Sequence, residues 1–292
     1  MAKNMRIGYL TRYSKEEAEW ACRNGFRSLQ LLIWPGDPLD PSIASEREIG
    51  EVFEHLSGLD IEVSALGYYP NHLAPDPKER GEANDHLLRL MEMAAKMNVP
   101  VVGTFAGRDP EKSVEENIPD FKDVFTPIAD KAETLGVKIG FENCPMFKNH
   151  PFRGINIAFT PNAWDLMFEA VPSKAIGLEY DPSHLVCQMI DYIEVIHEYG
   201  DRIVHVHAKD AEVIPWKLRR NGIFEKGTFR HRTPGFGDVD WKKVVSALAE
   251  IGYRGNLDIE GLHDEVFKDD REREGLLLSL KHLDQFVVHE YR

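Results

Sequence analysis

Four short segments of the chain each end in a side chain that binds metal ions well. Each segment has the apolar or alternating pattern of a buried β-strand, and the polar residue stands near its C-terminal end. The four residues are Glu142, Asp181, His207 and Glu260. A carboxylate in an apolar strand is costly to bury unless it is paired or bound to a cation, so we expect the four side chains to converge on one point. Two Glu, one Asp and one His form a mostly oxygen donor set, which suits Mn²⁺, Mg²⁺ or Co²⁺.

The elements that must position these side chains alternate regularly between strand and helix. Strands are predicted at 6–11, 28–34, 61–69, 100–106, 138–143, 175–181, 203–208 and 256–260. Amphipathic segments of helical period are predicted at 15–24, 41–56, 77–97, 118–135, 162–170, 191–199, 241–251 and 270–288. Such alternation implies parallel pairing, and eight units in 292 residues predict a closed barrel. Since no linker or shift in composition divides the chain, we expect an α/β fold, a single (β/α)₈ TIM barrel formed by residues 1–292 as one domain.

The charge and composition argue against several classes of function. The 49 acidic and 35 basic residues give a formal charge of -14, which opposes binding to a phosphate backbone, so no nucleic-acid partner is expected. Cys22, Cys144 and Cys187 form no CxxC pair, which argues against a zinc finger or a disulfide framework and fits a reducing compartment. No apolar run approaches the length of a membrane span, and no secretory hydrophobic segment follows Met1. We therefore expect a cytoplasmic protein without a membrane partner.

Two further polar residues near the predicted strand ends are candidates for substrate binding. His184 follows Asp181 by one turn of loop and could reach a substrate hydroxyl, the alternative being a helix cap or a surface histidine. Lys209 shares one face of its strand with His205 and His207. It could hold a substrate oxygen or pair with a neighbouring carboxylate. His205 lies one layer deeper in the barrel and is predicted to be a hydrogen-bonding residue of the core rather than a ligand.

Three more candidates for substrate contact lie in loops. The longest connection, 212–238, is rich in Arg and Lys, and we expect it to cover the mouth of the barrel and to supply a basic group. Arg232 is our candidate there, because a guanidinium can bind a substrate oxygen or carboxylate, although it could equally be a solvated loop charge. Trp34 could wall the pocket, and His72 could contact the substrate. Aromatic side chains in such positions are more often part of the core.

A set of motifs resembles a known family. The runs are FEN at Glu142, DPSH at Asp181, HVHAKD from His205, PGFGDVDW from Pro234 and DIEG at Glu260. Together they resemble the xylose-isomerase-like barrel superfamily, specifically its sugar phosphate isomerase/epimerase branch, over essentially the whole chain. The resemblance implies that Glu142, Asp181, His207 and Glu260 bind one divalent metal ion, Mn²⁺ first, with Mg²⁺, Co²⁺ or Zn²⁺ as alternatives. It also implies that Glu142 and Glu260 are the catalytic acid/base pair.

The resemblance leaves the reaction open. We expect a metal-dependent sugar or keto-sugar isomerase/epimerase that transfers a proton next to a carbonyl through an ene-diolate. Ketose 3-epimerases carry a second Glu six positions after the first catalytic one, where this chain has Lys148. The alternative is an inosose dehydratase-like enzyme or a 3-keto-sugar lyase with the same metal site. An endonuclease IV-type nuclease fits less well, since no His follows the strand at 100–106. The partner expected is a small-molecule sugar or keto-sugar, with a homo-oligomer left open.

Overall fold

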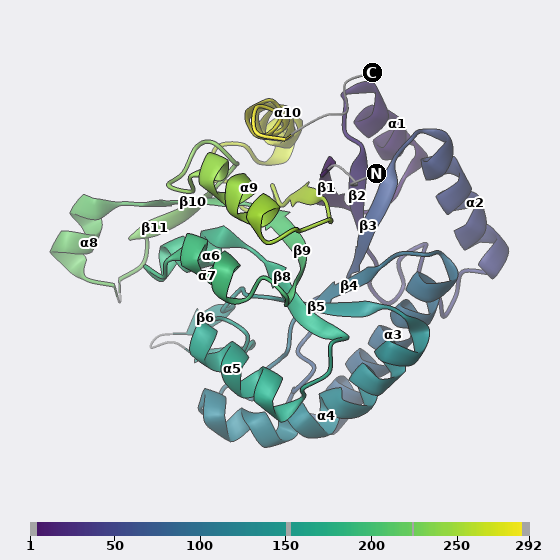
Figure 1. Ribbon diagram of the computed structural model, residues 1–292, viewed down its shortest axis with the longest axis horizontal. Helices are drawn as coiled ribbons and strands as arrows, with labels where there is room; N and C mark the ends of the chain where they lie inside the picture. Colours follow the sequence, from purple (N-terminus) through teal and green to yellow (C-terminus); the bar gives the residue numbers. More distant parts are fainter. Residues whose placement is uncertain (1–4, 150–152, 224, 288–292) are drawn as a thin grey trace.

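Parallel strands close into a barrel in the computed structural model, which describes residues 5–149, 153–223 and 225–287 (Figure 1). The barrel strands are β1 (Ile7–Thr11), β2 (Ser28–Leu32), β3 (Glu62–Gly67), β4 (Val101–Thr104), β5 (Lys138–Glu142), β8 (Ile176–Tyr180), β9 (Ile203–Ala208) and β12 (Leu257–Ile259). They pair in chain order, and β12 closes the barrel against β1. Each coincides with a predicted strand, so the predicted TIM barrel is confirmed.

Helices surround the barrel and cover the outer faces of its strands (Figure 1). They are α1 (Lys15–Arg23), α2 (Glu46–Gly58), α3 (Pro77–Lys96), α4 (Val114–Leu135), α5 (Pro161–Ala170), α7 (Tyr192–Glu198), α9 (Trp241–Glu250) and α10 (Glu272–Leu283), the last preceded by the 3₁₀ turn η1 (Asp269–Arg271). On β5, the ring of Phe141 packs outward against Phe121 and Phe125 of α4, with ring centroids 5.6 and 4.9 Å away. Because side chains alternate along a strand, this packing turns Glu142 toward the barrel interior.

Two helices begin four or more residues away from the predicted start. The periodic pattern predicts a start at Pro41 for α2, but residues 41–45 form turns and the helix begins after Ser45, whose side chain makes a capping box with Glu48. Helix α4 begins four residues earlier than predicted, and its capping box is made by Ser113 and Glu116. A capping box satisfies two otherwise unpaired N–H groups, and this local gain decides the first residue of a helix more strongly than apolar periodicity does.

The connection after β9 is folded, whereas the sequence predicts a long loop without regular structure. It contains the antiparallel strands β10 (Asp210–Val213) and β11 (Phe229–Arg232), joined through helix α8 (Pro215–Asn221). We call Asp210–Arg232 the β10–β11 arm; it extends away from the barrel beside α9 (Figure 1). Two other elements escaped prediction, helix α6 (Pro182–Cys187) and the short pair β6 (Phe147–Asn149) and β7 (Arg153–Gly154). Across the described residues, every helix is too short or too polar to cross a membrane.

Candidate active site

The predicted metal-binding residues all stand at the C-terminal ends of barrel strands. Glu142 is the last residue of β5, and Glu260 directly follows β12. Asp181 directly follows β8 and caps helix α6 by accepting a hydrogen bond from the backbone N–H of Ser183 at 2.8 Å. His207 lies within β9. All four are buried, which is expensive for charged groups unless they share partners.

These side chains gather around one point, together with a histidine that the sequence placed outside the metal shell. Ligand atoms of Glu142, Asp181, His184 and Glu260 all lie within 4.8 Å of one another. The Nδ1 atom of His207 lies 3.3 Å from Oε2 of Glu260 and 3.8 Å from Oε1 of Glu142. The side chains at these strand ends therefore converge on one point.

Several buried polar atoms in this cluster lack a hydrogen-bond partner among the described residues. They are Oδ2 of Asp181, Nε2 of His184, Nδ1 of His207 and Oε2 of Glu260. Leaving a buried polar atom unpaired costs about 1–3 kcal/mol, and more when the group is charged. Oxygen and imidazole atoms that point at one place without partners form the donor set that a divalent cation accepts, so these residues fit a bound metal ion.

The charges of the cluster also favour a bound cation. Burial and the nearby Glu260 oppose ionisation of Glu142, but the imidazoles of His184 and His207 beside it hold its pKa below the usual range. Burial raises the pKa of Asp181. Burial lowers the pKa of His207, but Glu179 and the other carboxylates raise it well above its usual range. The cluster thus attracts positive charge strongly, as a cation site must.

A set of buried side chains beneath the cluster orients His207. Its Nε2 lies 2.7 Å from Oε1 of Gln30 and 3.2 Å from Oε1 of Glu179, so Nε2 carries the proton and donates it. Nδ1 then faces the carboxylates, where a bound metal ion would displace the proton that this nitrogen carries. Fixing the tautomer of a ligating histidine through its second nitrogen is common in metal sites.

Glu179, which sequence reasoning missed, is the centre of this set. It is fully buried and accepts hydrogen bonds from Gln30 at 2.7 Å, Tyr69 at 2.8 Å and His205 at 2.9 Å. Burial raises its pKa, but His207 and His205 lower it more, to about 2. Gly103 makes room for it, because a Cβ there would collide with the Glu179 carboxylate. The sequence feature that could have identified this residue is the presence of a glutamate inside the apolar run Gly177–Tyr180.

His205 lies below the cluster, as predicted for a hydrogen-bonding residue of the core. Its Nδ1 is 2.9 Å from Oε1 of Glu179, and its Nε2 is 2.9 Å from Oδ2 of Asp258. Both ring nitrogens are therefore occupied and neither is free for a metal ion.

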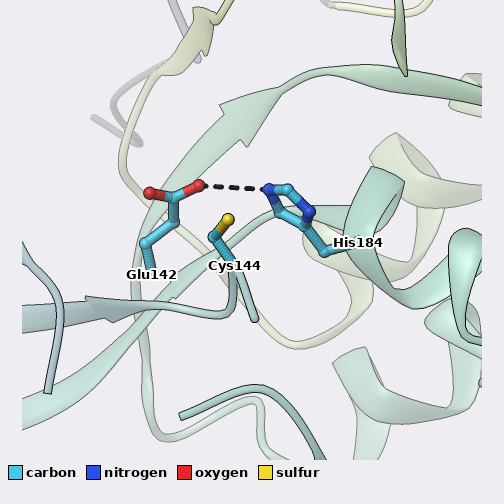
Figure 2. Close-up of side chains that lie close together, drawn as sticks. All are labelled: Glu142, Cys144 and His184. Atoms are coloured by element: carbon cyan, nitrogen blue, oxygen red, sulfur yellow. Dashed lines mark ion pairs between the residues drawn. The ribbon is translucent and has the colours of Figure 1, made fainter. Parts of the chain in front are cut away.

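His184 and Lys209 reach the cluster from two sides. The Nε2 atom of His184 lies 3.3 Å from both Oε1 of Glu142 and Oδ2 of Asp181. Figure 2 shows this imidazole facing Glu142, with the Cys144 thiol next to both. The ammonium of Lys209 lies 3.1 Å from Oε1 of Glu260. Burial lowers the pKa of Lys209, but Glu260 and Asp181 raise it above its usual value, so the lysine stays charged.

A cavity of about 750 Å³ opens above the cluster. Its floor includes Glu142, His184, Lys209 and Glu260, and its walls include residues of the β10–β11 arm. The arm therefore forms part of the cavity wall, and Lys226 and His231 are the basic residues that it contributes to the lining. Burial and the nearby Lys209 lower the pKa of His231 to about 2, so this imidazole is neutral.

Arg232 does not line this cavity, contrary to our expectation. Its Nε lies 3.2 Å from Asp264, and its Nη1 lies 2.9 Å from Glu212. Side chains alternate along β11, so His231 and Phe229 face the cavity while the two neighbouring arginines face away. Arg232 ties the arm to the loop after β12 instead.

Trp34 and His72 also lie outside the lining of the cavity. The ring of Trp34 packs edge-on against Tyr68, with centroids 5.0 Å apart. His72 is fully buried, with Nδ1 2.6 Å from Asn84 and Nε2 2.9 Å from Thr104, so neither nitrogen is available to a substrate. Both aromatic rings contribute to packing, which was the more common role for such residues.

The chain belongs to the xylose isomerase-like TIM barrel family, whose model matches residues 18–285. It is 31% identical to the inosose dehydratase of Geobacillus thermodenitrificans strain NG80-2 over 222 residues, 72% of this chain and 71% of that protein. The inosose dehydratase of Clostridium tetani strain Massachusetts is also 31% identical, over 68% of this chain and 69% of that protein. These relatives are enzymes, and the family is one of enzymes.

Solved structures share the fold at lower sequence identity. The D-psicose 3-epimerase of Clostridium cellulolyticum H10, solved with D-tagatose, has a TM-score of 0.72 and 19% identity, covering 97% of this chain and 99% of that one. The IolI protein, solved with a bound zinc atom, has a TM-score of 0.73 and 21% identity, again covering 97% and 99%. At such identities the likeness establishes the barrel and not the reaction.

Proposed function

We propose that this chain is a divalent-metal-dependent enzyme that moves a proton at the carbon next to a carbonyl of a sugar or keto-sugar, giving isomerisation or epimerisation. The observation that carries the proposal is the pair Glu142 and Glu260. Both are buried in the cluster, and their strands are separated in the barrel by β8 and β9, so they approach the centre from two sides. One can remove a proton while the other returns it.

The metal ion would be held by Glu142, Asp181, His207 and Glu260, with Mn²⁺ as the first candidate and Mg²⁺, Co²⁺ or Zn²⁺ as alternatives. The atoms without hydrogen-bond partners on Asp181, His207 and Glu260 support this assignment. When bound, such an ion polarises the carbonyl and hydroxyl oxygens of a substrate and so makes the neighbouring C–H more acidic.

The remaining side chains of the floor would bind and orient the substrate. Lys209 is charged and buried beside Glu260, where it can donate a hydrogen bond to a substrate oxygen and keep Glu260 ionised. His184 and His231 face each other with ring centroids 5.1 Å apart, and each has a buried nitrogen without a partner among the described residues. These nitrogens can pair with hydroxyl groups of a sugar.

Dehydration is the second candidate reaction, and the identity to inosose dehydratases favours it. It would begin with the same removal of a proton next to a carbonyl. It would end differently, because a protonated group such as His184 or Lys209 would assist a hydroxyl to leave as water. The two reactions therefore share their first step and their base.

The test is to incubate the Mn²⁺-loaded protein in D₂O with a panel of ketoses, keto-glucosides and keto-inositols and to follow the products by NMR. Deuterium should enter next to the carbonyl; epimerisation keeps the mass apart from the label, whereas dehydration loses water. Replacing either Glu142 or Glu260 with Gln should lower the exchange rate by about 10²-fold or more, since each acid/base group contributes at that scale.

The control for these variants is Glu51→Gln, which removes an exposed carboxylate that pairs with Arg47 on α2. It should leave exchange unchanged. If no member of the panel exchanges, and the protein instead cuts DNA at abasic sites, the proposal fails and the nuclease alternative replaces it.

A further inference from the structure

The walls of the cavity differ in chemistry from its floor. The floor is charged, but the walls are mostly apolar and include Phe105 and Phe159. A free sugar carries hydroxyl groups around its whole ring, and each one that loses water needs a new hydrogen-bond partner. Walls of this kind offer few such partners. The volume of about 750 Å³ falls within the range of about 300–1,000 Å³ that is typical for sites of drug-sized ligands.

Apolar side chains that are exposed to water gather at this cavity. Phe147, Met189, Ile223 and Phe229 are all large, at least 39% exposed, and part of its lining. Contiguous exposed apolar surface usually marks a binding site. They come from three separate segments: the stretch after β5, the end of α6, and the β10–β11 arm. The apolar surface is thus assembled by the tertiary structure around the route to the charged floor.

Two methionines of the lining hold an uncommon backbone conformation. Met146 has φ 48° and Met189 has φ 60°, the left-handed region, in which a bulky residue other than Gly is a genuine outlier. Met189 follows the C-cap of α6, where its N–H bonds to Val186 and the next N–H bonds to Leu185. Gly or Asn is usual at this position. Outliers of this kind cluster at ligand-binding sites, and methionine is a side chain that adapts to varied apolar ligands.

We infer that the apolar walls form a second subsite, which binds the apolar aglycone of a glycoside whose sugar ring lies on the charged floor. The inference rests on the proposed function, because the floor is what orients the sugar. The substrate is then a keto-glycoside with an aromatic or similar apolar substituent rather than a free sugar. The subsite is continuous with the floor, since Glu142, Lys209 and Met189 all line one cavity.

The test compares phenyl and methyl glycosides of glucose and galactose by isothermal titration calorimetry with the Mn²⁺-loaded protein. The phenyl member of at least one pair should bind roughly tenfold or more tightly than its methyl partner, because its ring buries more apolar surface. Equal affinities within every pair, or no binding of any phenyl glycoside, would overturn the inference.

The matched variant is Met146→Asn combined with Met189→Asn. Asn tolerates positive φ better than Met does, so the thermal midpoint should stay unchanged or rise while the phenyl preference falls by about fivefold. The control Ile43→Asn replaces an apolar residue that is 65% exposed and lies outside the cavity, and it should keep the full preference.

Two other outcomes distinguish failure of the proposed function from failure of the subsite. A phenyl preference without deuterium exchange for any keto-sugar would refute the proposed function, and with it the keto-glycoside as substrate, and would leave only an apolar site that binds glycosides. If the mouth is instead covered by a second copy of the chain, there will be no phenyl preference, and the methionine variants will shift a dimer toward monomer in analytical ultracentrifugation. That result would refute the subsite.

Discussion

The Nδ1 atom of His207 lies 3.3 Å from the Oε2 atom of Glu260, and both atoms are buried without a hydrogen-bond partner among the described residues. On the opposite edge of the same imidazole, Nε2 is held by Gln30 and Glu179. The ring is therefore fixed with one nitrogen presented to a carboxylate that it does not hydrogen-bond. This arrangement is understandable if a cation lies between the two atoms.

The first prediction concerns that cation. Adding Mn²⁺ at about 100 times its Kd should stabilise the wild-type protein by about 3 kcal/mol, measured as a rise in the denaturant midpoint. Asp181→Ala should abolish this stabilisation and lose metal in elemental analysis, since it removes a buried oxygen of the cluster.

Asp191→Ala is the matched control, because Asp191 caps α7 as Asp181 caps α6, with Oδ1 accepting from the backbone N–H two residues later. It should lose the cap and retain the metal response. Full metal occupancy in Asp181→Ala would contradict the proposed shell.

The second prediction concerns Lys209. Lys209→Met should lower kcat for any keto-sugar that exchanges deuterium by about 10²-fold or more, because Glu260 loses its buried cationic partner. His263→Gln is the comparison, since Nε2 of His263 lies 3.4 Å from the same carboxylate oxygen but its side chain is 56% exposed. Its effect should be much smaller. Similar losses in the two variants would mean that burial of the lysine is not what matters.

The third prediction concerns His72 and pH. Burial lowers the pKa of His72 to about 4, so the folded protein keeps this ring neutral while the unfolded chain takes up a proton below pH about 6.5. Stability should therefore fall as pH falls through this window, and His72 alone should account for about 2 kcal/mol of the loss between about pH 7 and pH 5.

Urea unfolding of metal-free wild-type protein and His72→Gln at both pH values measures this contribution. The variant should lose less stability on acidification and should keep its KM at neutral pH. If His72→Gln instead raises KM and leaves the pH dependence of the free energy of unfolding as in the wild type, His72 is a substrate contact.

The fourth prediction separates Arg232 from its neighbour. Arg232→Met should destabilise the protein by about 3 kcal/mol, because it leaves the Asp264 carboxylate buried without its guanidinium. Arg230→Met removes a more exposed ion pair with Glu212 and should cost less than about 1 kcal/mol. The measurement is chemical unfolding. An Arg232 variant of normal stability with a raised KM would show that the guanidinium contacts the substrate after all.

The barrel was predictable because its strands are short apolar runs separated by helices with clear periodicity. Residues at the ends of such runs must meet at one face, so Glu142, Asp181, His207 and Glu260 could be grouped from the sequence alone. Helix starts were less predictable, since the Ser45 capping box outweighs apolar periodicity over a few residues.

The sequence could also establish that His231 and Arg232 face opposite sides of any strand that contains them, because side chains alternate. Only the pairing of β11 with β10 and the contribution of the arm to the cavity wall decided which of them reaches the cavity. In the same way, a buried glutamate was visible at Glu179, but its hydrogen bonds come from β2, the loop after β3, and β9. The sequence determines local patterns, including which side chains share one face of a strand. Contacts between segments far apart in the chain depend on strand register and on the packing of the closed barrel.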